Sequence, residues 1–415
     1  GSAWNGEDSE VSQARQSSLN AYQGELYGNE RKGYSTIVTR EVAETIEWAM
    51  PLMMETFAGS SDSVAAFDPF GEEDKEQAKQ ESEVINYKVA KSNNWYAESY
   101  QWIKDALMYP NGYMKCWMEA TEEVTTESYM GITAIELAQY MEDEKVEIVE
   151  AEEFQAVDPD GMPYAVFNIK AKVTDKSHKL RLDATPGEQV LIDDGAVSHD
   201  LDEADFVIHH VERNYTWLVE NGFDRKKLDN VDEKTGYSYG EELNRKIYGE
   251  YDTEAEGDDD GLRRYQVFEV YGKVDYDGDG LAEKRRIVMI GDQIFENEED
   301  DYQPFVSMSA ILRQHSHTGM GLAEFVEDIQ KINTYFTRQV INNVMKINIP
   351  KKIIGDAFIS PEGDTIGQMM DGATEIVMAR DPMAINYEQP VSIAGEILPM
   401  IQHLTEKAGM RTGIN

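Results

Sequence analysis

One stretch constrains the fold of this chain more than any other: Leu322 to Ile347, which predicts a single long amphipathic helix. Its apolar residues recur in steps of three and four, the period of an α-helix, so they gather on one side. The other side carries Glu324, Glu327, Asp328, Lys331, Arg338, Asn342 and Lys346. Acids come first and bases last, as the helix macrodipole favours, and Pro350 ends the helix. At about 1.5 Å per residue the rod is roughly 40 Å long, so we expect the spine of a bundle or a packing strut between subunits.

The length of 415 residues predicts two or three domains, and 41% hydrophobic residues can fill a sizeable interior. No apolar run approaches the roughly 20 residues that span a bilayer. The N-terminus lacks the basic and apolar blocks of a signal peptide, so we expect a soluble protein with no membrane partner. The single cysteine, Cys116, excludes an intrachain disulfide and a cysteine-based zinc site, and we expect it to be a small buried residue in a strand.

The net charge of −42 results from 80 acidic against 38 basic residues. Such a chain should not bind DNA through the phosphates, because that binding depends on clustered Lys and Arg side chains and on the release of counterions. The charge fits a highly soluble protein, and it equally fits a surface that stays near a polyanion without sticking to it. Charge alone does not separate the two.

The order of predicted elements indicates an α+β chain with antiparallel sheets. Residues 1–33 are polar and predict a loose arm, and 249–261 predict a linker. Helices are predicted at 36–57, 72–91, about 96–107, 134–141, 215–220, 224–248 and from 392 onward. Alternation in Phe167–Val173 is typical of a half-solvated antiparallel sheet. Strands are predicted at 113–118, 145–150, 165–173, 189–192, 264–274, 284–290, 293–295, 352–355 and 375–378, and 200–213 as strand or loop.

Several pieces of sequence occur in an order that resembles the portal proteins of tailed double-stranded DNA phages, of the short-tailed-phage type. No single piece is specific for this family, but the order in which they follow one another from about residue 36 to the end is specific for it. The pieces are Arg40–Leu52, the break at Phe57, Phe67-Asp-Pro, Glu72–Ala78, Trp102–Leu107, Asn111–Lys115, Ala204–His209, Gly222-Phe-Asp, the Asp-Gly-Asp-Gly turn, and Gly319–Leu322 with Gln330 and Asn333.

The resemblance implies a structural protein without enzymatic activity or cofactor. It implies a ring, usually of about twelve subunits, at one capsid vertex of the virion, assembled in the host cytoplasm. The ring would dock the terminase packaging motor and later the tail or adaptor proteins, and would contact capsid and scaffolding proteins. Double-stranded DNA would pass through it, without sequence specificity, during packaging and ejection.

The same resemblance implies a portal fold with a helix-rich wing, long stem helices and a small clip. By position, residues 1–35 would be a flexible arm, 36–200 the wing, 201–261 a wing-to-stem segment and linker, and 262–310 the clip. Residues 311–350 would be the long stem helix and 351–415 the wing or tunnel-helix region. The crown is absent, so we expect further chain in the complete protein. The charged residues of the long helix, Glu324, Glu327, Asp328, Lys331, Arg338 and Lys346, are candidates for subunit packing or for the channel side.

One acidic loop suggests a cation site. Asp275, Asp277 and Asp279 occupy positions one, three and five of an EF-hand-like loop and Gly280 position six, but position twelve is Arg286. Because strands are predicted on both sides, a tight β-turn is favoured. If Ca²⁺ or Mg²⁺ binds, its ligands would be Asp275, Asp277, Asp279 and Glu283.

Two histidine pairs suggest a metal or hydrolase site, but neither His209-His210 nor His315-Ser-His317 has the i, i+4 spacing of a helical zinc pair. A loop or helix-entry role is favoured for them. Neither a phosphate-binding Gly-x-x-x-x-Gly-Lys loop nor a Gly-x-Ser-x-Gly elbow occurs. Lys351-Lys352 would be solvated or form a basic ring. Two alternatives to the portal therefore stay open: an acidic metal-dependent hydrolase, and a Ca²⁺-binding scaffold or adhesin.

Overall fold

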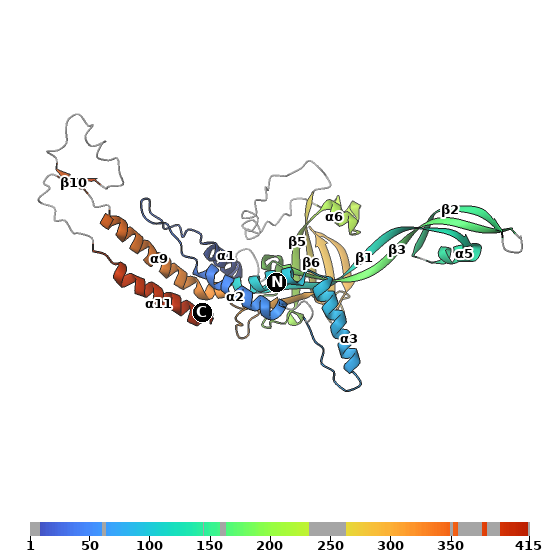
Figure 1. Cartoon of the computed structure of the whole chain (residues 1–415), viewed down its shortest axis with the longest axis horizontal. Helices are drawn as coiled ribbons and strands as arrows, with labels where there is room; N and C mark the ends of the chain where they lie inside the picture. The colour runs from blue at the N-terminus through green and yellow to red at the C-terminus, as the bar shows by residue number, and fades with distance from the viewer. Residues whose placement is uncertain are drawn as a thin grey trace, which may run out of the picture. The chain divides into compact units, whose positions relative to one another are not determined.

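The computed structural model describes residues 9–59, 64–143, 145–157, 163–231, 263–348, 352–355, 376–379 and 391–413. The chain divides into two compact units (Figure 1). One contains Gly1–Thr56, Ser99–Met114 and Ala184–Asn415, and the other contains Phe57–Glu98 and Lys115–Asp183. Helices and antiparallel sheets both occur, as the predicted α+β class requires. Among the described residues, no helix has the length and apolar character needed to cross a membrane.

The long helix predicted from periodicity is present as α9, Leu322–Asn348, with 27 residues. Val326 and Ile329 of the predicted apolar stripe are buried, whereas Ile332 is 42% exposed. The buried side of α9 also contains four polar residues, Gln330, Asn333, Thr334 and Arg338. The side chains of this group are buried because other parts of the chain supply their hydrogen-bond partners.

The prediction of a loose N-terminal arm is wrong for Glu10–Gln23, which form helix α1. Ser9 caps its start by accepting a hydrogen bond from the Ser12 amide, and Gly24 ends it at φ 71°. The helix packs against α9 and buries Val11 and Ala21. Its buried side also includes Ser12, Arg15 and Ser18, so the sequence shows no clear apolar stripe. Helix α2, Glu41–Ala58, contains Pro51 as predicted.

A five-stranded antiparallel sheet in the first unit has the order β4-β5-β6-β7-β8. Its strands are β4 Val190–Ile192, β5 Phe206–Asn214, β6 Arg264–Val274, β7 Glu283–Ile290 and β8 Gln293–Glu299. Helices α6, Tyr215–Glu220, and α7, Arg225–Leu228, contribute Leu218 and Leu228 to a core with residues of β6 and β7. The residues predicted as a compact β-unit, 262–310, thus share their sheet with β4 and β5. Strand β9, Phe305–Met308, belongs to a different sheet.

The second unit holds α3, Lys75–Asn86, a π-helical turn, Tyr87–Lys91, and most of a sheet with the order β2-β3-β1-β9. Its long strands are β1 Gly112–Thr133, β2 Val146–Val157 and β3 Pro163–Thr185, with α5, Ala134–Glu142, between β1 and β2. Helix α4, Trp95–Met108, and β1 run from one unit into the other.

The alternation predicted for Phe167–Val173 is confirmed in β3. Ile169 and Ala171 are buried, whereas Lys170 and Lys172 are exposed and lie opposite Glu150 and Glu147 of β2. Cys116 lies in β1 as predicted but is half-buried rather than buried. The predicted strands 352–355 and 375–378 correspond to a parallel pair, β10 Lys352–Gly355 and β11 Ile376–Ala379. Most of the predicted helix 224–248, and all of the predicted linker 249–261, lie outside the described residues.

Candidate functional site: the α9–α11 helix pair

Helices α9 and α11, Ala394–Thr412, lie side by side in opposite directions (Figure 1). At one end, the Asn343 side chain donates from Nδ2 to the Val391 carbonyl at 3.0 Å and accepts at Oδ1 from the Ile393 backbone amide at 3.2 Å. At the other end, Arg411 donates to Asp328 at 2.8 Å. Contacts at both ends fix the antiparallel direction. The chain between the two helices includes the β10–β11 pair.

The opposite flank of α9 binds the segment that leads from α1 into α2. Gln330 is fully buried, and its side-chain amide donates to the Ala21 carbonyl at 2.8 Å and accepts from the Val42 amide at 2.9 Å. Val42 lies in the first turn of α2, whose amides have no partner within the helix, so Gln330 acts as a cap from another part of the chain. Asn333 donates to the Glu41 carboxylate in the same turn at 2.8 Å.

Arg338 holds the middle of this segment. Its guanidinium donates to the Glu30 carboxylate at 2.7 Å, to the Asn29 side chain at 3.0 Å and to the Ile37 and Thr36 carbonyls. The planar group satisfies four acceptors at once, which a lysine would not do. Burial alone would raise the pKa of Glu30, but its hydrogen bonds with Arg338 and with backbone amides outweigh burial, so this pKa lies below its ordinary value.

Of the six charged candidates on α9, five have a contact inside the chain and some exposure. Glu324 accepts from Arg313 at 2.8 Å, and Asp328 pairs with Arg411. Glu327 pairs with Lys331 at 2.6 Å and accepts from the Ser17 hydroxyl. The Lys346 ammonium lies 5.7 Å from the centre of the Tyr34 ring. For Arg338 the sequence-based expectation needs correcting, because its guanidinium is buried beneath the chain's own residues 29–37.

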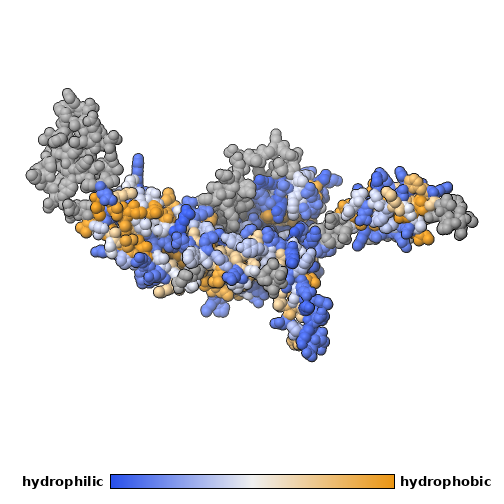
Figure 2. All heavy atoms as spheres, in the orientation of Figure 1, coloured by the Kyte–Doolittle hydropathy of each residue, from blue (hydrophilic) through white to orange (hydrophobic). Residues whose placement is uncertain are grey.

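An open groove of about 720 Å³ separates α2 from α11. We call it the acidic groove, since its rim carries Glu41, Glu44 and Glu406 and none of its lining residues is a Lys or Arg. Trp48 lines it and remains 68% exposed. On the α11 side the lining includes the small residues Thr405, Ala408 and Gly409. Figure 2 also shows hydrophobic residues gathered toward the ends of α9 and α11 that lead to β10 and β11, where Met345 and Leu398 are 47% and 51% exposed.

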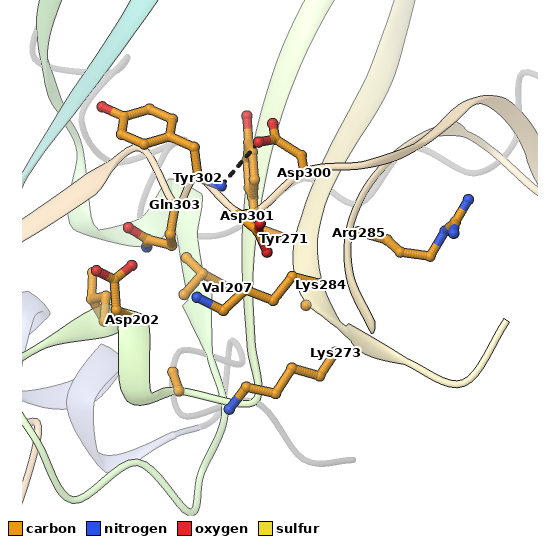
Figure 3. A pocket seen from close by; sticks show the side chains of 13 residues that line it. Asp202, Val207, Tyr271, Lys273, Lys284, Arg285, Asp300, Asp301, Tyr302 and Gln303 are labelled. Atoms are coloured by element: carbon orange, nitrogen blue, oxygen red, sulfur yellow. Dashed lines mark hydrogen bonds between the residues drawn. The ribbon is translucent and has the colours of Figure 1, made fainter. Parts of the chain in front are cut away.

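A second, much smaller pocket of about 30 Å³ lies at one end of strands β5, β6 and β7 of the five-stranded sheet (Figure 3). Lys273 and Lys284 are direct cross-strand neighbours there, and Lys273 pairs with Asp205 at 3.5 Å. Lys284 extends past Val207, whereas Arg285 points away from the pocket. Asp202, Asp300 and Asp301 also line it, so positive and negative charges are mixed. The space is far smaller than the roughly 300–1,000 Å³ of a typical small-molecule site, so it is too small for an organic ligand.

The aspartate loop is a turn between β6 and β7, as the favoured prediction states. One carboxylate oxygen from each of Asp275, Asp277 and Asp279 lies within 4.8 Å of the others, and all three residues are exposed. These carboxylates accept hydrogen bonds from backbone amides of the turn itself, such as Gly278 to Asp275 at 2.8 Å. Glu283 pairs with Arg285 at 3.1 Å and is not part of the cluster. The four predicted ligands are therefore not brought together.

The histidines do not form a metal centre within the described parts of the chain. His209 lies on β5 with Glu269 at 3.4 Å, and His315 is in an exposed turn at φ 55°. His317 is buried, with Nδ1 3.0 Å from the Ser198 carbonyl and Nε2 3.2 Å from the Tyr113 hydroxyl. Burial lowers the pKa of His317. Lys351 lies outside the described residues, and for Lys352 only the backbone, as the first residue of β10, is described.

These features describe a pair of long helices braced by polar contacts. Within the described residues, Gln330 and Arg338 join α9 to the segment that leads from α1 into α2. The chain belongs to the Phage SU10 portal protein family, whose family model matches residues 2–415. The resemblance seen in the sequence is thereby confirmed: this is a phage portal protein and a component of the virion. No curated protein matches the chain.

Sequence reasoning missed the polar side chains that carry the α9 contacts. Gln330 and Asn333 entered only as part of the family resemblance, and Asn343 did not enter at all. One signal was present, because Asn333 falls within the apolar stripe of the predicted helix and Gln330 lies at the edge of that stripe. A polar residue in a predicted apolar stripe indicates a buried hydrogen-bond partner elsewhere.

Proposed function

We propose that the protein assembles into a ring of about twelve subunits at one capsid vertex and serves as the conduit for genome packaging and ejection. The family match over residues 2–415 is the observation that carries this proposal. In this role the ring docks the terminase motor and later the tail or adaptor proteins, and contacts capsid and scaffolding proteins. Double-stranded DNA passes through without sequence-specific contacts.

Within this ring, α9 and α11 are proposed as the two stem helices, and the segment between them, with β10 and β11, as the clip. Their antiparallel packing, held by Asn343 at one end and Arg411 at the other, supports this assignment. Strands β6, β7 and β8, which fall within the clip predicted at 262–310, are proposed as part of the wing, since they share a sheet with β4 and β5 from residues 190–214.

The charge of the chain suits a conduit. A ring of about twelve copies at −42 each carries on the order of five hundred negative charges before any neutralisation. A wall of that sign repels phosphates and avoids the clustered Lys and Arg contacts that would stall moving DNA. Glu324, Glu327, Asp328, Lys331 and Lys346 are proposed to face the channel or a neighbouring subunit, where each exposed ion pair contributes about 0–1 kcal/mol.

The proposal is tested by mass photometry and negative-stain electron microscopy of the full chain over a range of protein concentrations. The expected result is a particle near twelve times the chain mass of 47.1 kDa, with an axial opening. Particles that lack an opening, or a chain that stays monomeric at every concentration and at both low and high salt, would refute it.

A further inference from the structure

A basic strip runs along the solvent side of α9 and the N-terminal segment bound to it. We define it by Arg31, Lys32, Tyr34, Lys331, Tyr335 and Lys346, all of which are exposed. The bonds of Arg338 to residues 29–37, and the bond from the Ser35 amide to the Asn342 side chain at 2.7 Å, hold the segment against the helix. These bonds therefore hold the strip in place, and it combines residues about three hundred positions apart in the sequence.

The strip is unusual for a chain with a net charge of −42. Of its four cations, Lys331 pairs with Glu327, and Lys346 lies over the Tyr34 ring. Arg31 and Lys32 have no carboxylate partner among the described residues. The other acids near the strip have basic partners of their own: Glu30 pairs with Arg338, Asp328 with Arg411 and Glu324 with Arg313. Positive charge and two exposed tyrosine rings are thus left for an outside partner.

The acidic groove between α2 and α11 has the opposite character. Glu41, Glu44 and Glu406 line it without any cation, and Trp48 offers a large exposed aromatic surface beside small residues. Its lining residues come from α2 and α11, whereas the strip consists of α9 and residues 31–34, so the two surfaces share no residue. One chain therefore carries two separate surfaces of complementary charge.

We propose that the basic strip of one copy docks in the acidic groove of the next copy, a contact that rests on the proposed ring. A closed ring of identical subunits needs a heterologous interface, in which two different surfaces of the same chain fit each other. Opposite charge steers the encounter and fixes the register, and an aromatic residue in a groove is a common anchor of such interfaces. The pairing of strip and groove meets these requirements.

Two charge-reversal variants of the full chain test this pairing. The strip variant carries Arg31→Glu, Lys32→Glu and Lys346→Glu. The groove variant carries Glu44→Lys and Glu406→Lys. In each variant alone, strip and groove have the same sign, so ring formation should be lost. In an equimolar mixture every strip meets a groove of opposite sign if the two chains alternate, so mass photometry should show rings again.

Matched controls separate charge from folding. Asp292→Lys with Glu298→Lys makes the same number of reversals as the groove variant on exposed residues of the β7–β8 turn and β8, and should form rings as the unaltered chain does. Circular dichroism melting checks that every variant is folded. Trp48→Ala, which changes no charge, should require at least a tenfold higher protein concentration for ring formation.

The outcomes test the strip–groove pairing and the proposed ring separately. Rings formed by either reversal variant alone, or no rings in the mixture of two folded variants, would overturn the strip–groove pairing while the proposed ring stands. Failure of the unaltered chain to form any ring would instead count against the proposed function. If the strip variant forms rings but shows weaker retardation of double-stranded DNA in a gel at low salt, the strip contacts DNA, and the pairing is overturned.

Discussion

Replacing Gln330 with methionine should destabilise the contact between α9 and the start of α2 by about 1.5–4.5 kcal/mol. Gln330 is fully buried, and its side chain is the partner of the Val42 amide. Methionine has a similar volume, so packing is kept, but the Val42 amide is left buried without an acceptor. An unsatisfied buried group of this kind costs about 1–3 kcal/mol.

The second bond, from Gln330 to the Ala21 carbonyl, contributes less. That carbonyl also accepts from the Gly24 amide at 3.2 Å, so it keeps one partner in the variant. The lost bond is worth about 0.5–1.5 kcal/mol. The two contributions together give the expected range.

Urea unfolding and amide hydrogen exchange measure the effect. The unfolding midpoint should fall, and exchange at Val42 should accelerate more than exchange in the five-stranded sheet. Gln339→Met, the same substitution on a half-buried position of α9, is the control and should change neither. Unaltered exchange at Val42 in Gln330→Met would refute the assignment of Gln330 as the cap of α2.

Gln330→Glu gives an independent check through its pH dependence. The new carboxyl can accept from Val42, but it can donate to Ala21 only when protonated, and burial disfavours its charge. Its pKa in the folded chain should therefore lie above the ordinary value of about 4.3. A group with a raised folded pKa stabilises at low pH, and this stability is lost as the pH rises toward that pKa. Gln330→Met should show no such added dependence.

Three further results are expected. Burial lowers the pKa of His317, so the unfolded chain takes up a proton at a higher pH than the folded chain, and stability should fall as the pH drops below about 6.5. The melting temperature of His317→Gln should depend less on pH between 7 and 5.5. The same pH dependence in the variant and the unaltered chain would contradict this. Gly321→Ala should abolish folding or lower the melting temperature sharply, because a Cβ there would lie 2.7 Å from the Met108 carbonyl and 2.8 Å from that of Tyr109. Near-normal melting would show that the close approach of these carbonyls to residue 321 is not required. Gly395→Ala, with open space around the new Cβ and a helical position in α11, should instead stabilise by about 0.5–1 kcal/mol in urea unfolding, and a loss of stability would contradict the helix assignment.

Local patterns in the sequence were sufficient to predict several elements closely. The helix predicted at 322–347 is observed at Leu322–Asn348, and the alternation in Phe167–Val173 gave the buried and exposed faces of β3 correctly. Both predictions depend on a repeat of side-chain character along a few turns or a few residues. Such a repeat is a property of neighbours in the chain, so it can be read without knowing the partner surface.

Helix α1 shows where local reasoning fails. Its buried side includes Ser12, Arg15 and Ser18, so polarity indicated a loose arm although the segment packs against α9. The same limit applies to the aspartate loop. Spacing offered Glu283 as a fourth ligand beside Asp275, Asp277 and Asp279 in case a cation binds, but the structure pairs Glu283 with Arg285. Competition among neighbouring charges decided that outcome, and spacing carries no information about it.

The sequence by itself determined the acidic charge, the long amphipathic helix, the α+β class and, through the succession of its motifs, membership of the portal family. The tertiary structure alone decided that α11 returns along α9, that β4 and β5 join β6–β8, and that Gln330 and Arg338 are buried beneath the N-terminal segment. The physical reason is that periodicity reports only whether a face is apolar. Whether a polar side chain is hydrated or bonded depends on residues hundreds of positions away.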